Sequence, residues 1–336
     1  MSNKNPFHKK YILALIILIL CAVSGYVYLV LTWKPLVSEA QKASEAVIRS
    51  VAATQVIDKE KSYSYRIVHK EPNDLTDEDF AQVESFYLSG KTLSDIKLLE
   101  KFTNLKELDL SNTRFPKTKI PILVKIFSKL HLVNLSNRNL INLKSLEKLY
   151  NLKILILSYA KIKNIEPLAG LRNLELLALD GTPVENIKPL ANLINLKELY
   201  LSGTKVGDIS SLLKLNKLEV IMLDGNKVEN IQSVSGMTNL KSLILTGTNV
   251  SDIKPVKNLI NLNHIDLRKT KVRNVEPLTS LINLDSVFLS DTKISDIRPL
   301  ATLTNLQELF IENCINITDE QIEELQEALP NLIITK

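Results

Sequence analysis

The sequence predicts an α/β solenoid, in which one short unit stacks on copies of itself and forms a horseshoe with a parallel sheet on its concave side. Three observations predict this fold. The segment Leu-x-x-Leu-x-Leu, with apolar residues at the named positions, is written nine times. Consecutive copies begin 22 residues apart without exception, from Leu130 to Leu306, and a fixed period of this size is typical of solenoids. A second apolar segment returns with the same period.

The first half of each unit predicts a β-strand. In the unit from Asn195 to Asn216, Leu199 and Leu201 are two residues apart, as on one face of a strand. One unit is too small to bury its own leucines, each of which contributes roughly 1.5–3 kcal/mol when buried. Stacking on neighbours buries them in a continuous core, and the strands then pair in parallel.

The second half of each unit predicts short 3₁₀ pieces or turns on the convex side. Ile162-x-x-Ile165-x-Pro167-Leu168 recurs from Val184, Val250, Val272 and Ile294, while Ser211 and Ser233 replace the proline in two other units. Proline disfavours helix at the residue before it, and few residues remain before the next strand.

The turn after each strand carries a small polar residue, expected to hydrogen-bond backbone that would otherwise be buried unpaired. These residues are Thr182, Thr204, Asn226, Thr248, Thr270, Thr292 and Cys314. Glycine precedes four of them, as in Gly181-Thr182, where the turn needs a positive φ. We interpret these residues as structural.

The combined pattern is Leu-x-x-Leu-x-Leu-x-x-Thr-x-Val-x-Asp-Ile-x-Pro-Leu-x-x-Leu-x-Asn-Leu, over about residues 83–311. It resembles the leucine-rich repeat superfamily, specifically its short-repeat, internalin-like class. One departure is Lys217, which replaces the Asn before the strand. The resemblance implies protein recognition on the concave face and no catalysis; it does not name the partner.

The N-terminal part predicts a membrane anchor. Residues 1–10 form a basic tail, and residues 11–33 are uncharged and long enough to cross a bilayer as a helix. Residues 1–34 contain four lysines and no acid, so they account for +4 of the chain's net charge of +5. We expect a single-pass signal anchor with the tail inside and the repeats extracytoplasmic. The alternative is a secreted protein cleaved near Ser24.

The remaining segments connect the anchor to the repeats. Residues 34–58 predict a stalk helix, because apolar residues recur at spacings of three and four, and residues 36–57 offer a seam for self-association. Residues 59–75 form a linker that could contain one capping strand. The repeat domain covers residues 76–336, with a capping helix beginning near Thr76 and another near Thr318, where Thr318 and Gln321 match a capping box.

The sequence predicts no enzyme, cofactor or metal site. His131 and His264 are more than five repeats apart, and no catalytic, phosphate-binding or metal-ligand motif occurs. The nearly neutral body gives no electrostatic footprint for nucleic acid.

The expected binding surface consists of the strand residues that alternate with the buried leucines. Many are apolar or aromatic, where a merely solvated face would be charged. The candidates are Ile154, Ile156, Leu176, Tyr200, Val220, Met222, Ile244, Phe288 and Phe310. We therefore expect a membrane-anchored module that binds another protein; the alternatives are a self-assembling envelope protein or a regulatory subunit of an enzyme.

Overall fold

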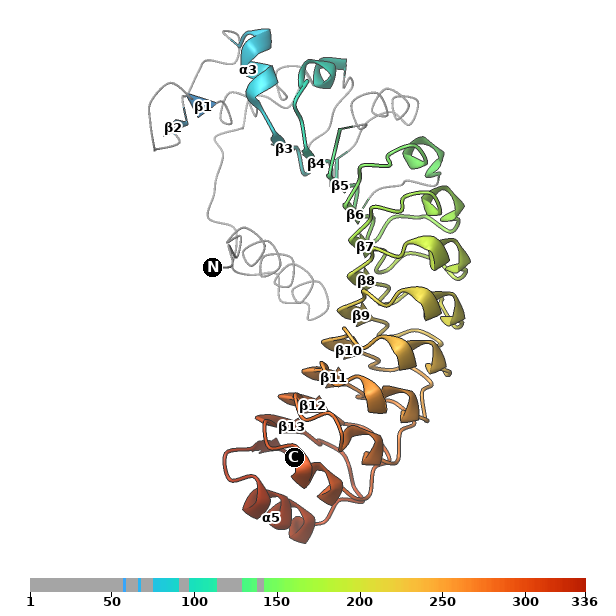
Figure 1. Cartoon of the computed structure of the whole chain (residues 1–336), viewed down its shortest axis with the longest axis vertical. Helices are drawn as coiled ribbons and strands as arrows, with labels where there is room; N and C mark the ends of the chain where they lie inside the picture. Colours follow the sequence, from blue (N-terminus) through green and yellow to red (C-terminus); the bar gives the residue numbers. More distant parts are fainter. Residues whose placement is uncertain (1–56, 59–65, 68–74, 91–96, 114–128, 138–141) are drawn as a thin grey trace. The chain divides into compact units, whose positions relative to one another are not determined.

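The computed structural model describes residues 57–58, 66–67, 75–90, 97–113, 129–137 and 142–336. Within them, twelve strands form one parallel sheet in which each strand pairs with the next in chain order. The strands line the inner side of a curved stack of repeats (Figure 1). They are β3 (Ser85–Tyr87), β4 (Glu107–Asp109), β5 (Leu132–Asn134), β6 (Ile154–Ile156), β7 (Leu176–Ala178), β8 (Glu198–Tyr200), β9 (Val220–Met222), β10 (Ser242–Ile244), β11 (His264–Asp266), β12 (Ser286–Phe288), β13 (Glu308–Phe310) and β14 (Ile333–Thr335). The predicted solenoid with a parallel sheet is confirmed.

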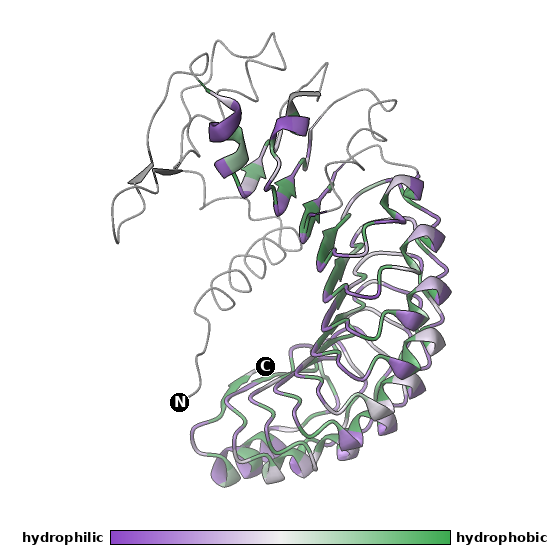
Figure 2. Ribbon diagram, turned by 45° about the horizontal axis from the view of Figure 1, so that its top comes forward, coloured by the Kyte–Doolittle hydropathy of each residue, from purple (hydrophilic) through white to green (hydrophobic). Residues whose placement is uncertain are grey.

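The middle residue of each strand points into the core. Leu199 pairs in register with Ile221, and Leu243 with Ile265, so equivalent side chains stack from repeat to repeat. All four are completely buried. The ribbon coloured by hydropathy shows apolar residues on the strands and also on the segments that return on the convex side (Figure 2). This stacked apolar layer holds the repeats together, as the 22-residue period predicts.

Short 3₁₀ helices occupy the convex side of the described repeats, as predicted. They are η2 (Lys97–Lys101), η4 (Lys144–Leu146), η5 (Glu166–Leu168), η6 (Lys188–Asn192), η7 (Ser210–Lys214), η8 (Gln232–Gly236), η9 (Lys254–Asn258), η10 (Glu276–Leu278) and η11 (Arg298–Thr302). From η4 to η11, an Asn or Asp side chain accepts a hydrogen bond from the backbone two residues on, as Asp208 does from the Ser210 N–H at 2.8 Å. This local bond starts the turn. Of the two serines that replace proline, Ser211 donates to the Ile187 carbonyl, whereas the buried Ser233 hydroxyl has no partner among the described residues.

The turns after the strands have the predicted chemistry. Gly181, Gly203, Gly225 and Gly247 all have positive φ. Thr182, like Thr248, Thr270 and Thr292, donates to the carbonyl three residues earlier at 2.6 Å. Thr204 instead donates to Asn226, whose amide returns to the Leu201 carbonyl. Cys314 is buried and its thiol contacts the Leu289 carbonyl.

An asparagine ladder joins neighbouring repeats at the residue before the first strand leucine. Amides in this ladder donate to the backbone carbonyl 23 residues earlier, at 2.7–2.9 Å, as those of Asn104, Asn173, Asn195, Asn239, Asn261, Asn283 and Asn305 do. Lys217 breaks the ladder, and its ammonium group donates to the Asn195 side chain at 2.7 Å instead.

Helices cover both ends of the described repeats. α3 (Asp77–Gln82) begins with a complete capping box between Thr76 and Asp79. At the other end, α5 (Asp319–Ala328) begins at Thr318, whose hydroxyl accepts from the Gln321 N–H. The rest of the predicted capping box is wrong.

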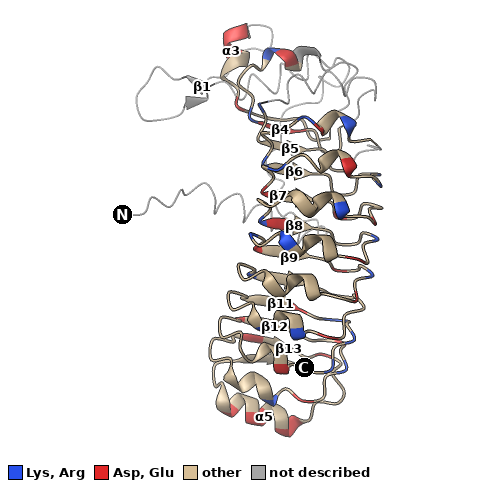
Figure 3. Cartoon of the chain, turned by 45° about the vertical axis from the view of Figure 1, so that its right-hand side comes forward, with Lys and Arg blue, Asp and Glu red and all other residues tan. Residues whose placement is uncertain are grey.

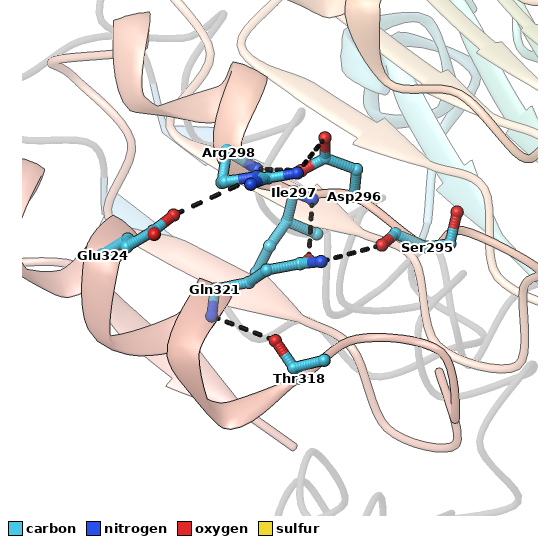
Figure 4. A network of polar contacts seen from close by, with 7 residues as sticks. All are labelled: Ser295, Asp296, Ile297, Arg298, Thr318, Gln321 and Glu324. Carbon is cyan, nitrogen blue, oxygen red and sulfur yellow. Dashed lines mark hydrogen bonds and ion pairs between the residues drawn. The ribbon is translucent and has the colours of Figure 1, made fainter.

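The side chain of Gln321 does not return to the helix N-terminus. It donates to the Ser295 carbonyl at 3.0 Å and accepts from the Ile297 N–H at 3.4 Å, so it bonds α5 to the preceding repeat (Figure 4). Arg298 extends the network to Asp296, at 2.8 Å, and to Glu324. A bond across the interface thus replaces a bond within the helix.

The N-terminal predictions fall mostly outside the described residues. A two-stranded antiparallel sheet joins β1 (Ile57–Asp58) to β2 (Arg66–Ile67), so the predicted stalk helix is wrong for its last two residues. Their pairing with β2 supplies the backbone hydrogen bonds, and β-branched Ile57 favours a strand. The tail, the 11–33 anchor and the rest of the stalk are outside the described residues. In the part that is described, no helix has the length and apolar character to cross a membrane.

Candidate protein-binding surface

The concave surface consists of the first and third residues of each strand. Seven of the nine predicted residues lie there partly exposed: Ile154, Ile156, Val220, Met222, Ile244, Phe288 and Phe310. The other two, Leu176 and Tyr200, are only 6% and 1% exposed. All nine residues occupy the first or third position of a strand, but the sequence pattern could not give their accessibility.

Strand pairing places the outward positions of neighbouring strands side by side, although those of β7, Leu176 and Ala178, are buried. Ile154 pairs in register with Leu176, and Ile156 with Ala178. Met222 likewise pairs with Ile244. Parallel strands lie about 4.8 Å apart, so side chains on successive strands touch. The result is an apolar surface on β6 and on β9 and β10, which we call the central patch: Ile154, Ile156, Val220, Met222 and Ile244.

Tyr200 differs from the expected exposed aromatic contact. Its hydroxyl donates to Glu198 of the same strand. Burial, together with the neighbouring carboxylate, raises the pKa of the Tyr200 phenol. Tyr200 therefore stays protonated and holds Glu198 in place, and it is not part of the exposed surface.

A second aromatic cluster lies toward the C-terminal end of the sheet. The rings of Phe288 and Phe310 stack with centroids 4.4 Å apart and planes 6° apart. His264 packs against Phe288 at 4.8 Å, and the Arg268 guanidinium lies 5.2 Å from the Phe288 centroid. Burial lowers the pKa of His264, which favours a neutral imidazole. We call these four residues the aromatic patch. His264 occupies the first position of β11, so it belongs to the alternating strand pattern. Arg268 lies in the turn, outside that pattern, and the sequence therefore did not indicate it.

Arg268 also compensates a buried charge. The Asp266 side chain is buried. The Arg268 guanidinium donates hydrogen bonds to both of its carboxylate oxygens, with Nε 3.0 Å from each. This bond raises the pKa of Arg268. The pair fixes the plane of the guanidinium beside Phe288.

Carboxylates and hydroxyls form a polar edge along the turns beside the central patch. Asp180 accepts from the Ser202 N–H at 2.9 Å and the Ser158 hydroxyl at 3.1 Å, while Ser202 donates to Asp224. Burial raises the pKa of Asp180. Tyr159 lies in the same edge, and burial with the nearby Asp180 and Asp224 raises its pKa.

A groove lies on the flank of the sheet, away from the predicted residues. Its volume is about 460 Å³, and Lys153, Glu175 and Lys197 form ion pairs across it, at 3.1 and 2.7 Å. The remaining lining includes members of the asparagine ladder. These residues are already bonded to one another, so the groove is an inter-repeat seam. Nowhere in the described ranges do three or more His, Cys, Asp or Glu residues gather in a way that could hold a metal ion.

Comparisons with known proteins agree with this architecture. A family model described as leucine-rich repeats, in two copies, matches residues 194–236 and 282–332. No curated protein matches the chain. Among solved structures, an internalin (inlF) of Listeria monocytogenes is 22% identical, with a TM-score of 0.69, and the match covers 90% of this chain and 92% of that one.

Two further structures extend the comparison. A leucine-rich repeat protein of Leptospira interrogans is 22% identical over 77% of this chain and 73% of its own, with a TM-score of 0.64. The ectodomain of a plant membrane receptor kinase from Arabidopsis thaliana, in complex with Casparian strip integrity factor 2, is 19% identical. That match covers 71% of this chain and 37% of the receptor chain, with a TM-score of 0.52.

The fold defined by these repeats is a leucine-rich repeat solenoid. Two segments of the chain match leucine-rich repeats, and its structural neighbours include an internalin. Leucine-rich repeats in general form a non-catalytic, protein-binding fold, but a fold alone does not specify a partner.

Proposed function

We propose that this chain binds another protein through the concave side of its sheet and catalyses no reaction. The observation that carries the proposal is the central patch, a set of partly exposed apolar side chains that β6, β9 and β10 present on the concave side. Folded proteins bury such side chains when they can, and contiguous apolar surface marks interaction sites. The aromatic patch adds Phe288 and Phe310, residues of the type enriched in interface cores.

The proposal also includes membrane anchoring through residues 11–33, with the repeats extracytoplasmic. The support is the uncharged 11–33 segment behind a basic tail. One structural neighbour is an ectodomain of a membrane receptor, solved with a bound factor. Digestion of the repeats by protease added outside intact cells tests this orientation. Protection of the repeats would contradict it and would favour the role of a regulatory subunit inside the cell.

Two substitutions on the concave side test the binding surface. Ile156→Asp and Met222→Asp place a charge in the central patch without removing a core leucine. Leu213→Asp is the matched control, because Leu213 is an exposed apolar residue of η7 on the convex side. The readout is the set of proteins crosslinked to the full chain in its own cells, with folding checked by circular dichroism.

The proposal expects both concave variants to lose a crosslinked protein that the wild type and the Leu213→Asp variant retain. Buried apolar contacts of this kind contribute roughly 1.5–3 kcal/mol per side chain, so the loss should be at least tenfold. Identical crosslinked proteins in all four folded chains would refute the concave site. A product twice the mass of the chain that persists in the concave variants would favour self-association.

A further inference from the structure

The charged residues that the sheet presents on its concave side are all acidic. In the first and third positions of β3 to β14 there are five acids and no Lys or Arg: Glu107, Asp109, Glu198, Asp266 and Glu308. The lysines beside the sheet instead precede the strands, on its flank, where Lys106, Lys197 and Lys241 pair with glutamates of neighbouring repeats. Figure 3 shows the acids and bases along the ribbon.

The acids of β4 keep their charge uncompensated by the described residues around them. Glu107 accepts from the hydroxyls of Ser85, at 2.9 Å, and Tyr87, at 2.6 Å. Asp109 accepts from the Asn134 amide at 3.0 Å and from a backbone N–H. These donors are neutral, so none of them brings a positive charge to either carboxylate. Asp266, in contrast, is already paired with Arg268.

The β4 acids lie at the border of the apolar surface. Glu107 pairs in register with Leu132, which pairs in turn with Ile154 of the central patch. Asp109 is related to Ile156 through Asn134 in the same way. A segment lying on the central patch therefore reaches these two carboxylates within two strands, about 10 Å. At the other end, exposed Glu308 shares β13 with Phe310.

We propose that the partner contributes an apolar polypeptide segment with Lys or Arg residues that face Glu107 and Asp109. This inference rests on the proposed function, because it assigns chemistry to the partner of the same surface. Covering two carboxylates with an uncharged partner removes their water without replacement. An acidic partner adds repulsion, whereas a guanidinium or ammonium group supplies charge-assisted hydrogen bonds.

The test is a display selection of short random peptides on the full chain in mild detergent. Peptides that bind the wild type are then tested on the Met222→Asp variant, and those that still bind are discarded. The retained peptides are those whose binding needs the concave side. We expect the retained peptides to be enriched in apolar residues and in Lys and Arg relative to the starting library. Retained peptides that are neutral or acidic would overturn the inference and leave the proposed function intact. A selection in which no peptide depends on Met222 would count against both.

Charge reversal at β4 provides the second arm. A chain with Glu107→Lys and Asp109→Lys should bind the selected basic peptides at least about tenfold more weakly, equivalent to about 1.4 kcal/mol, and added salt should reduce the difference. Glu229→Lys, a single charge reversal at an exposed position before η8, should leave binding unchanged. If the double lysine variant misfolds, Glu107→Gln with Asp109→Asn removes the charge conservatively. Equal affinity of the wild type and a folded β4 variant would overturn the inference.

Discussion

The aromatic ring of Tyr159 lies against Gly181 of the next repeat, in the space that any other residue would fill with a Cβ atom. A Cβ built on Gly181 would stand 2.4 Å from Tyr159 Cδ1, far inside van der Waals contact. Both residues occupy the same left-handed turn position of their repeats, with φ of +61° and +62°. A glycine is thus required at position 181 for two reasons: the backbone has a positive φ, and the Tyr159 ring leaves no room for a Cβ atom.

The substitution Gly181→Ala should therefore destabilise the chain more than Gly203→Ala does. Gly203 has the same φ, but its Cβ would meet nothing within 4 Å, so that variant reports backbone strain alone, about 1–2 kcal/mol. Displacing the ring in Gly181→Ala should add about 1 kcal/mol or more. Urea unfolding midpoints of the full chain measure both. In a Tyr159→Ala background the two alanine variants should cost the same; a persisting difference would assign the extra cost to another cause.

The asparagine ladder predicts opposite effects for two substitutions at equivalent positions. Asn283→Ala removes a 2.7 Å hydrogen bond to the Ile260 carbonyl and should cost about 0.5–1.5 kcal/mol. Lys217→Asn should restore the missing rung, to the carbonyl of Ile194, and stabilise the chain by a similar amount. Thermal unfolding of the full chain measures both. A destabilised Lys217→Asn variant would show that the Lys217 contact with Asn195 stabilises the chain more than the restored hydrogen bond to Ile194 does.

Asp180 predicts a pH-dependent stability. Burial raises its folded-state pKa above the ordinary value of 3.8, so the folded chain binds this proton more tightly than the unfolded chain. The contribution of Asp180 to stability is therefore most favourable at acidic pH and falls as the pH rises from about 3.8 through the raised value. Asp180→Asn should gain stability relative to the wild type across that interval, as measured by urea midpoints at successive pH values.

Asp208→Asn is the matched control for Asp180. A hydrogen bond from the Ser210 N–H lowers the pKa of Asp208, so its carboxylate favours the folded state above the unfolded pKa. Its replacement should shift the pH dependence in the opposite sense and only slightly, because the side chain is exposed. Parallel pH profiles for wild type and Asp180→Asn would contradict the prediction.

The buried Asp266 predicts a large effect for Arg268→Gln. The variant leaves a buried carboxylate without its cation; such losses cost 3–5 kcal/mol at fully buried pairs. Because the Arg268 side chain is 44% exposed, water offsets part of this, and we expect roughly 1–3 kcal/mol. Asp266→Asn introduced together with Arg268→Gln should recover most of it, as measured by urea unfolding. A single variant as stable as the wild type would show that the pair contributes nothing to folding.

The sequence by itself determined the periodic part of this protein. The strand positions, the buried leucines such as Leu199, the 3₁₀ segments and the threonine turn bonds all depend on residues close in the chain. They repeat at 22-residue intervals, so the pattern that creates one repeat also creates the neighbour that covers it.

The tertiary structure decided how side chains of different repeats share space. Gln321 bonds to the preceding repeat rather than to its own helix, Tyr159 fills the space over Gly181, and Arg268 pairs with Asp266 beside Phe288. Tyr200 occupies an outward-facing strand position but is buried. Gln321 and Tyr159 meet groups 22 or more residues away in the chain, and Arg268 meets Phe288, in the next repeat. The exposure of Tyr200 depends on the packing around it. The period gives a residue's direction, and the neighbours decide what it meets.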